Sequence, residues 1–239
     1  MNSIDLLENL KKYPVFDMPA FAEAAGLEPA SAKVRLFRMK NKGRILEIQR
    51  NSYTVLRDPL IIASRVVWPS YISLWYALRY HQMTAQIVHG IDVLSPRATF
   101  RRSIDFLGTQ IYFVRISPEF LYGYDRLNLQ DHEVFMAYPE KALVDALHLR
   151  KISVAEVFEI IYNNRKKLNI ERLVDYTKRS KDNATIRRIG YLLDRIGHHR
   201  KELLTGQRDL PAIPLDYSFP SEGSLNRKWK IIVNMEAQK

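Results

Sequence analysis

The 239-residue sequence has no cysteine and only nine glycines, which are scattered singly along the chain. The lack of cysteine excludes a disulfide framework, a thiolate zinc finger, an iron–sulfur site and a cysteine nucleophile. No glycine-rich phosphate-binding loop is present. The longest apolar stretches, such as the one that ends at Trp68, are far shorter than the roughly 20 residues of a membrane span. The opening residues carry carboxylates within their apolar stretch, unlike a signal peptide, so we expect a cytoplasmic protein that does not enter a membrane.

Positive charge is what the sequence has in excess. There are 37 Lys+Arg against 26 Asp+Glu, a net charge of +11, which favours a polyanionic partner without identifying it. Residues 29–57 hold eight basic side chains and one acid, Glu47, and residues 150–209 hold fifteen basic and eight acidic side chains. Residues 59–149 carry eight of each sign. Two basic regions therefore flank a neutral centre.

The N-terminal residues predict two short helices. The first spans about residues 3–12, with Ser3 as its cap. Its expected apolar face consists of Ile4, Leu7 and Leu10. The second helix begins after Asp17, a good N-cap residue, and ends at Gly26. Flanking the Asp17 cap, Phe16 and Phe21 have the spacing of a hydrophobic staple.

A third, basic helix is expected over about residues 30–42, closed by Gly43. A short turn separates it from the second helix, which is the plan of a helix-turn-helix unit. Its predicted buried stripe consists of Ala32, Leu36, Met39 and Gly43. Residues 44–48 and 52–56 read as two strands joined at Arg50, so they predict a wing. Residues 1–58 are thus interpreted as a winged helix-turn-helix domain.

The side chains of the third helix that lie outside its buried stripe, together with those of the wing, are of the types that bind DNA. Arginine and asparagine match guanine and adenine edges, whereas Lys33, Lys42 and Arg44 are expected to meet phosphates. The candidate DNA contacts are Ser31, Lys33, Val34, Arg35, Arg38, Asn41, Lys42, Arg44, Arg50 and Asn51. The alternative reading is a solvated helix face, or a helix-turn-helix unit used for dimerisation or protein binding.

Residues 59–239 are expected to form a second domain. Its sheet-rich part spans residues 70–138, its helical part 139–205, and a closing strand 229–234. The sheet-rich part should begin with a helix at Pro69, followed by strands over 87–94, 103–107, 110–116 and 132–138. Further helices are expected from Pro139 and over 153–163, 169–180 and 184–197. The predicted fold class is therefore α+β: a winged helix, then a mixed α/β domain with a small, mostly antiparallel sheet and C-terminal helices.

The sequence shows no catalytic constellation. No two histidines stand at the i,i+3 or i,i+4 spacing of a metal pair, and His198 and His199 are adjacent, which suits no common metal motif. A nuclease-like pattern begins at Asp105 and Gln110 but has Tyr112 where a lysine is needed. We expect no enzyme activity, no catalytic residue, no metal and no cofactor.

Five segments, taken in order, resemble one family. They are 36–45 with 51–53, 71–78, 138–145, 188–193 and 228–234. Together they resemble the AbiEi-like antitoxins and transcriptional regulators of AbiE-type (type IV) toxin–antitoxin systems, which act in abortive infection. The wing tip, Arg50-Asn51-Ser52, departs from the Arg/Lys-Gly-Val type of turn that is common there.

The resemblance implies an autoregulator that binds inverted repeats of double-stranded DNA in its own promoter. It also implies an antitoxin that counteracts a cognate nucleotidyltransferase toxin, directly or indirectly. The alternative is a protein- or RNA-interaction module, based on residues 150–209, that neutralises its partner without DNA binding. The sequence leaves the oligomeric state open.

Overall fold

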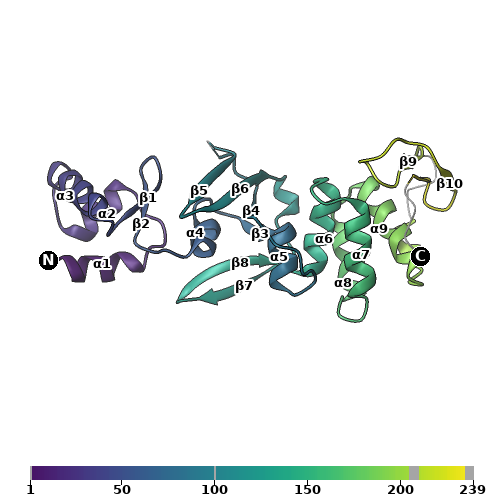
Figure 1. The fold of residues 1–239 in the computed structure, drawn as a ribbon, viewed down its shortest axis with the longest axis horizontal. Helices are drawn as coiled ribbons and strands as arrows, with labels where there is room; N and C mark the ends of the chain where they lie inside the picture. The colour runs from purple at the N-terminus through teal and green to yellow at the C-terminus, as the bar shows by residue number, and fades with distance from the viewer. Residues whose placement is uncertain (1, 100, 205–209, 235–239) are drawn as a thin grey trace. The chain divides into compact units, whose positions relative to one another are not determined.

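The computed structural model describes residues 2–99, 101–204 and 210–234 (Figure 1). It is an α+β protein with two compact units. The first unit comprises Met1–Ile72, Val88–Leu121 and Asp125–Met136, and the second comprises Ser73–Ile87, Tyr122–Tyr124 and Ala137–Lys239. Position 205 of the expected helical part and residues 235–239 lie outside the described residues.

Three helices open the first unit: α1 (Ser3–Lys11), α2 (Met18–Ala25) and α3 (Pro29–Asn41). Asn2, not Ser3, caps α1, because its Oδ1 accepts a hydrogen bond from the Ile4 backbone N–H. The apolar face predicted for α1 is also wrong in part, since Ile4 is 68% exposed while Leu6 and Leu10 are buried. Packing against α2 and α3 buries Leu6 and Leu10 and leaves Leu7 only partly buried.

The other two helices follow the sequence signals. Asp17 caps α2 by accepting a hydrogen bond from the Ala20 N–H, and Gly26 ends it in the left-handed conformation. The rings of Phe16 and Phe21 stack with centroids 6.3 Å apart, as the staple predicted. The three helices share one core with the start of the following segment, whose buried members are Leu6, Leu10, Phe16, Phe21, Ala25, Ala32, Leu36, Met39 and Ile45.

A two-stranded antiparallel hairpin follows, formed by β1 (Leu46–Gln49) and β2 (Ser52–Thr54). Tyr53 of β2 also exchanges two backbone hydrogen bonds with Phe16, at 2.9 and 2.8 Å. The linker between α1 and α2 thus lies beside the hairpin, which joins the hairpin to the helical core.

A six-stranded sheet, in the order β5-β6-β4-β3-β8-β7, forms the rest of the first unit with helix α4 (Pro59–Arg65). Its strands are β3 (Tyr71–Ser73), β4 (Gly90–Ser95), β5 (Ser103–Phe106), β6 (Thr109–Arg115), β7 (Tyr124–Leu129) and β8 (His132–Ala137), and the short 3-10 helix η1 (Pro118–Phe120) follows β6. The predicted hairpin of β5 and β6 is confirmed. The expectation of a mostly antiparallel sheet is corrected, because β4 pairs with β6, and β3 with β8, in parallel. The local pattern fixes the hairpin, but not which of its strands joins β4.

The second unit contains α5 (Leu74–Tyr80), α6 (Pro139–His148), α7 (Val154–Asn163), α8 (Ile170–Arg179) and α9 (Asn183–Arg195). The helix expected from Pro69 begins only at Leu74, because Ile72 is paired with Met136 in the sheet. The helices from Pro139 onward are confirmed. After the 3-10 helix η2 (Lys201–Leu203), a separate three-stranded sheet consists of β9 (Ile213–Pro214), β10 (Ser224–Asn226) and β11 (Ile231–Val233). The closing strand is thus confirmed as the shorter β11.

Helix α6 carries a fully buried ion pair between Lys141 and Asp145. The Lys141 ammonium lies 4.7 Å from the centroid of the Tyr122 ring, and Asp145 Oδ2 accepts a 2.8 Å hydrogen bond from the Ser73 hydroxyl. Burial lowers the pKa of Lys141, while the neighbouring carboxylate opposes that shift. The i,i+4 spacing brings the two side chains together on one face of α6, and packing of the second unit excludes solvent from both.

Candidate nucleic-acid interface

The candidate interface is the exposed face of α3 together with the β1–β2 hairpin, which we call the α3–hairpin surface. Nine of the ten side chains expected to contact DNA are exposed, and the tenth, Arg35, is half-buried. The structure brings together the eight that lie within residues 31–44, on α3 and the turn after it, and places Arg50 and Asn51 at the hairpin turn.

The buried stripe of α3 decides which side chains face outward. Ala32, Leu36 and Met39 are buried, as the helical period predicted. Gly43 does not belong to that stripe, because it lies beyond the helix, is exposed and has φ +66°. A helix turns by about 100° per residue, so Val34 and Asn41 lie opposite the stripe, with Arg38 beside them.

A shallow hollow of about 650 Å³ lies on this face, between the beginning of α1 and the outward side of α3. Its lining consists of Ser3, Ala30, Ser31, Val34, Arg35 and Arg38. The lining thus combines two arginines and two serines with the apolar side chains of Ala30 and Val34, and none of these described lining residues is acidic. Such a surface suits an anionic ligand that also presents some apolar area.

The single acid of the basic segment is neutralised within the protein. Glu47 of β1 forms a salt bridge with Lys40 of α3, and this pairing raises the pKa of Lys40. Arg57 donates a 3.1 Å hydrogen bond to the carbonyl oxygen of Gly43, which ties the turn after α3 to the segment after β2. The sequence reasoning missed both contacts, although the opposite charges of Lys40 and Glu47 were a usable signal.

The Asn51 side chain binds the beginning of α2, a contact that the sequence did not indicate. Its Oδ1 accepts a 3.2 Å hydrogen bond from the Met18 N–H at the beginning of α2, and its φ is +56°. Asparagine tolerates this left-handed conformation better than most residues. The Asn51 oxygen is thus engaged at α2, whereas Arg50 stands exposed at the turn.

The second basic region, residues 150–209, contributes less surface charge than its composition suggests. Arg187 and Arg188 are buried within α9. Arg187 donates to the carbonyl oxygen of Pro211, and Arg188 donates to those of Leu215 and Pro214. These guanidinium groups hold the C-terminal segment against α9 instead of facing solvent.

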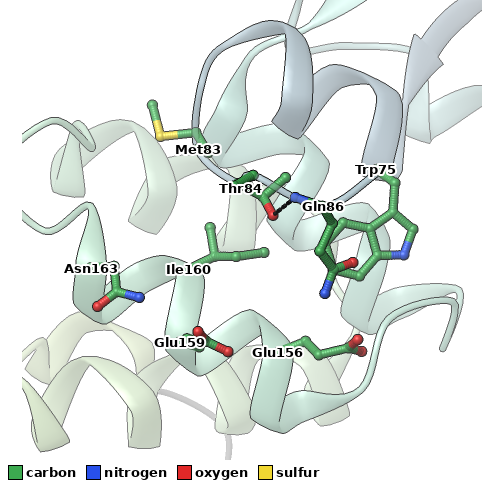
Figure 2. Close-up of a pocket in the computed structure, with 9 residues that line it drawn as sticks. Trp75, Met83, Thr84, Gln86, Glu156, Glu159, Ile160 and Asn163 are labelled. Carbon is green, nitrogen blue, oxygen red and sulfur yellow. Dashed lines mark hydrogen bonds between the residues drawn. The ribbon is translucent and has the colours of Figure 1, made fainter. Parts of the chain in front are cut away.

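A second concavity, of about 270 Å³, lies within the second unit (Figure 2). Figure 2 shows Trp75 and Gln86 on one side and Glu156, Glu159 and Ile160 of α7 along another. Glu156 already accepts hydrogen bonds from the backbone and hydroxyl of Ser153 in a capping box. In the part of the chain that the structure describes, no group of three or more histidine, cysteine, aspartate or glutamate residues is placed to hold a metal ion. The pocket therefore offers hydrogen-bond acceptors beside an indole ring.

Comparison with models of known protein families and with curated proteins finds no match to the chain. Among residues 2–99, 101–204 and 210–234, no helix has both the length and the apolar character needed to cross a membrane.

Proposed function

We propose that residues 1–58 form a winged helix-turn-helix domain that binds double-stranded DNA, with α3 as the recognition helix and the β1–β2 hairpin as the wing. The single observation that carries this proposal is the α3–hairpin surface, where exposed basic side chains surround the outward side of one helix. The common core of the three helices and the backbone hydrogen bonds between Phe16 and Tyr53 join the helices and the hairpin, which supports reading them as one module.

The electrostatics of this surface support a polyanion. Lys33, Arg38, Lys42 and Arg44 are exposed, while Glu47 is paired with Lys40. A duplex whose phosphates these side chains neutralise would release counterions, so binding should weaken steeply with salt. Arg38 and Asn41 on the outer face have the forked hydrogen-bonding groups that match base edges in the major groove.

We further propose that the chain acts in the cytoplasm as a transcriptional autoregulator and antitoxin. It would repress its own operon through inverted repeats and counteract a cognate nucleotidyltransferase toxin, directly or indirectly. The support for this part is the resemblance of the ordered segments to AbiEi-like regulators. Inverted repeats also suit a DNA-binding unit that acts in two copies.

A gel-shift titration tests the DNA proposal, using the DNA immediately upstream of the chain's own coding sequence. The double variant Arg35→Ala plus Arg38→Ala should bind at least about 30-fold more weakly, since a good bidentate contact is worth about 1–3 kcal/mol. Each lost phosphate contact should reduce the salt slope by about one. Unchanged binding by this double variant would rule out α3 as the recognition helix.

The matched control is Lys166→Ala plus Lys167→Ala, which removes the same net charge from the exposed turn between α7 and α8. It should bind the upstream DNA as the unaltered protein does. If this control loses as much affinity as the α3 variant, the attraction reflects net charge or the 150–209 region, and the interaction-module alternative gains support.

A further inference from the structure

Apolar side chains run along the centre of the α3–hairpin surface. Val34 and Phe37 are 51% and 60% exposed, and Ala30, one turn before Val34, is exposed as well. We call these three residues the apolar strip. Single exposed hydrophobic side chains are common on protein surfaces. Here, however, all three lie on the outward side of one helix, beside Arg38 and Asn41, which makes a mixed apolar and hydrogen-bonding surface.

The residues around Val34 limit which kind of ligand can bind over its side chain. It lines the hollow on α3 together with Arg35, Arg38 and the hydroxyl groups of Ser3 and Ser31, and no carboxylate lines that hollow. Charge complementarity with the exposed Arg38 therefore favours an anionic occupant. The same occupant has to present an apolar group to Val34, between groups that accept hydrogen bonds from arginine.

We propose that Val34 reads a thymine by packing against its C5-methyl group in the major groove of DNA. This inference rests on the proposed DNA-binding function and specifies which base the recognition helix selects. The thymine methyl is the apolar group among the donor and acceptor groups that the base pairs present in the major groove. Double-stranded RNA fits less well, because its major groove is deep and narrow and side chains cannot read it.

The position of Arg38 extends the inference to a short sequence. Arg38 is four residues beyond Val34, about 6 Å along the helix axis, and base pairs are spaced by about 3.4 Å. An arginine pairs best with the O6 and N7 acceptors of guanine. A guanine is therefore expected about two base pairs from the thymine in each half-site.

The experiment begins with selection of bound duplexes from a randomised double-stranded DNA library, using the full-length protein. Each thymine of the selected motif is then replaced singly by deoxyuridine, which removes only the C5-methyl group. The unaltered protein should lose about fourfold in affinity at one thymine per half-site, the fold-change that corresponds to one buried methyl-sized group at about 0.8 kcal/mol. At that position Val34→Ala should bind thymine and deoxyuridine equally.

Two further variants keep the assignment specific. Ile87→Ala removes a more exposed apolar side chain outside the α3–hairpin surface, and it should retain the full deoxyuridine effect. Phe37→Ala should also retain it, because the inference assigns the methyl contact to Val34. Since Val34 is exposed, the thermal midpoint of Val34→Ala should equal that of the unaltered protein, so that a loss of selectivity reflects recognition.

The outcomes separate the two claims. If the unaltered protein selects no sequence, the proposed function itself fails. If a motif is selected but no deoxyuridine replacement weakens binding by more than twofold, only the thymine inference is overturned. It is likewise overturned if the deoxyuridine effect persists in Val34→Ala or disappears in Phe37→Ala, or if an RNA duplex of the selected sequence binds as tightly as the DNA.

Discussion

Replacing Lys141 with methionine should destabilise the second unit by about 3–5 kcal/mol. Lys141 and Asp145 are both fully buried, so the variant leaves the Asp145 carboxylate without its ammonium partner in a region that water does not reach. Breaking one member of a buried ion pair typically costs this amount, because the remaining charge has lost its solvation and its partner together. The Ser73 hydroxyl still donates to Asp145, but one hydrogen bond does not replace the counter-charge.

Removing both charges should cost less than removing one. The double variant Lys141→Met plus Asp145→Ala removes both charges of this pair, and the Ser73 hydroxyl loses its Asp145 acceptor. An unsatisfied buried hydroxyl costs about 1–3 kcal/mol. The matched control is Glu171→Gln, which breaks the pair between Arg200 and a largely exposed carboxylate. That change should cost less than about 1 kcal/mol, since solvent screens such pairs.

Urea unfolding followed by tryptophan fluorescence measures these differences. The chain has three tryptophans, of which Trp75 and Trp229 belong to the second unit and Trp68 to the first. A Trp68→Phe background therefore makes the signal report the second unit. For a chain of this size, 3–5 kcal/mol corresponds to a fall in thermal midpoint of about 6–20 °C.

A loss below about 1 kcal/mol in Lys141→Met would refute the reasoning, and so would a double variant less stable than either single variant. The same proteins bear on function. If the Pro139–Asp145 segment serves stability, the double variant is expected to keep its fold and to retain the toxin-counteracting activity proposed above. If it stays folded but no longer counteracts the toxin, this segment has a direct part in antitoxicity.

Two further predictions concern α9. Gly190→Ala should destabilise the second unit by about 1–3 kcal/mol in urea unfolding, although alanine favours a helix, because a β-carbon at Gly190 would overlap the buried ring of Trp229; equal or higher stability would contradict this packing. Burial alone would raise the pKa of Asp182, but hydrogen bonds from His148, Thr185 and the Ala184 N–H outweigh it and hold the pKa below its usual 3.8. The resulting stability is present above about pH 4 and is lost as the pH falls further, so Asp182→Asn, which keeps the cap acceptor, should lose about 1–2 kcal/mol at pH 7. Between pH 7 and pH 2, the free energy of unfolding should fall less steeply for Asp182→Asn than for the unaltered protein. An equally steep fall in both proteins would mean that other groups cause the acid sensitivity.

Patterns within a single element carried the parts of the fold that the sequence predicted well. The helical period placed Ala32, Leu36 and Met39 in the core and left Val34 and Arg38 outside, because burial of one stripe fixes the opposite face. The cap at Asp17 and the helices from Pro139 onward could be predicted as well, because their signals also lie within a few neighbouring residues. The exposed basic character of the candidate interface could therefore be predicted, since it depends on residues close together in the chain.

Contacts between residues that are far apart in the chain could not be predicted from the sequence. Ile72 pairs with Met136 in the sheet, which makes a strand of Tyr71–Ser73 where a helix was predicted. At the candidate interface, the bond from the Met18 N–H to Asn51 spans 33 residues. No local pattern reports such a partner, because it depends on how separate elements pack.

Local periodicity, capping and composition were enough to predict the α+β class, most helices, the hairpin of β5 and β6, and the clustering of positive charge around α3. Which charges face solvent depends on how the elements pack in three dimensions. This packing buries Lys141, Arg187 and Arg188, and it pairs Glu47 with Lys40. The physical reason is that a charge in the sequence has no environment: its solvation, its partner and hence its role are set by the residues that folding brings around it.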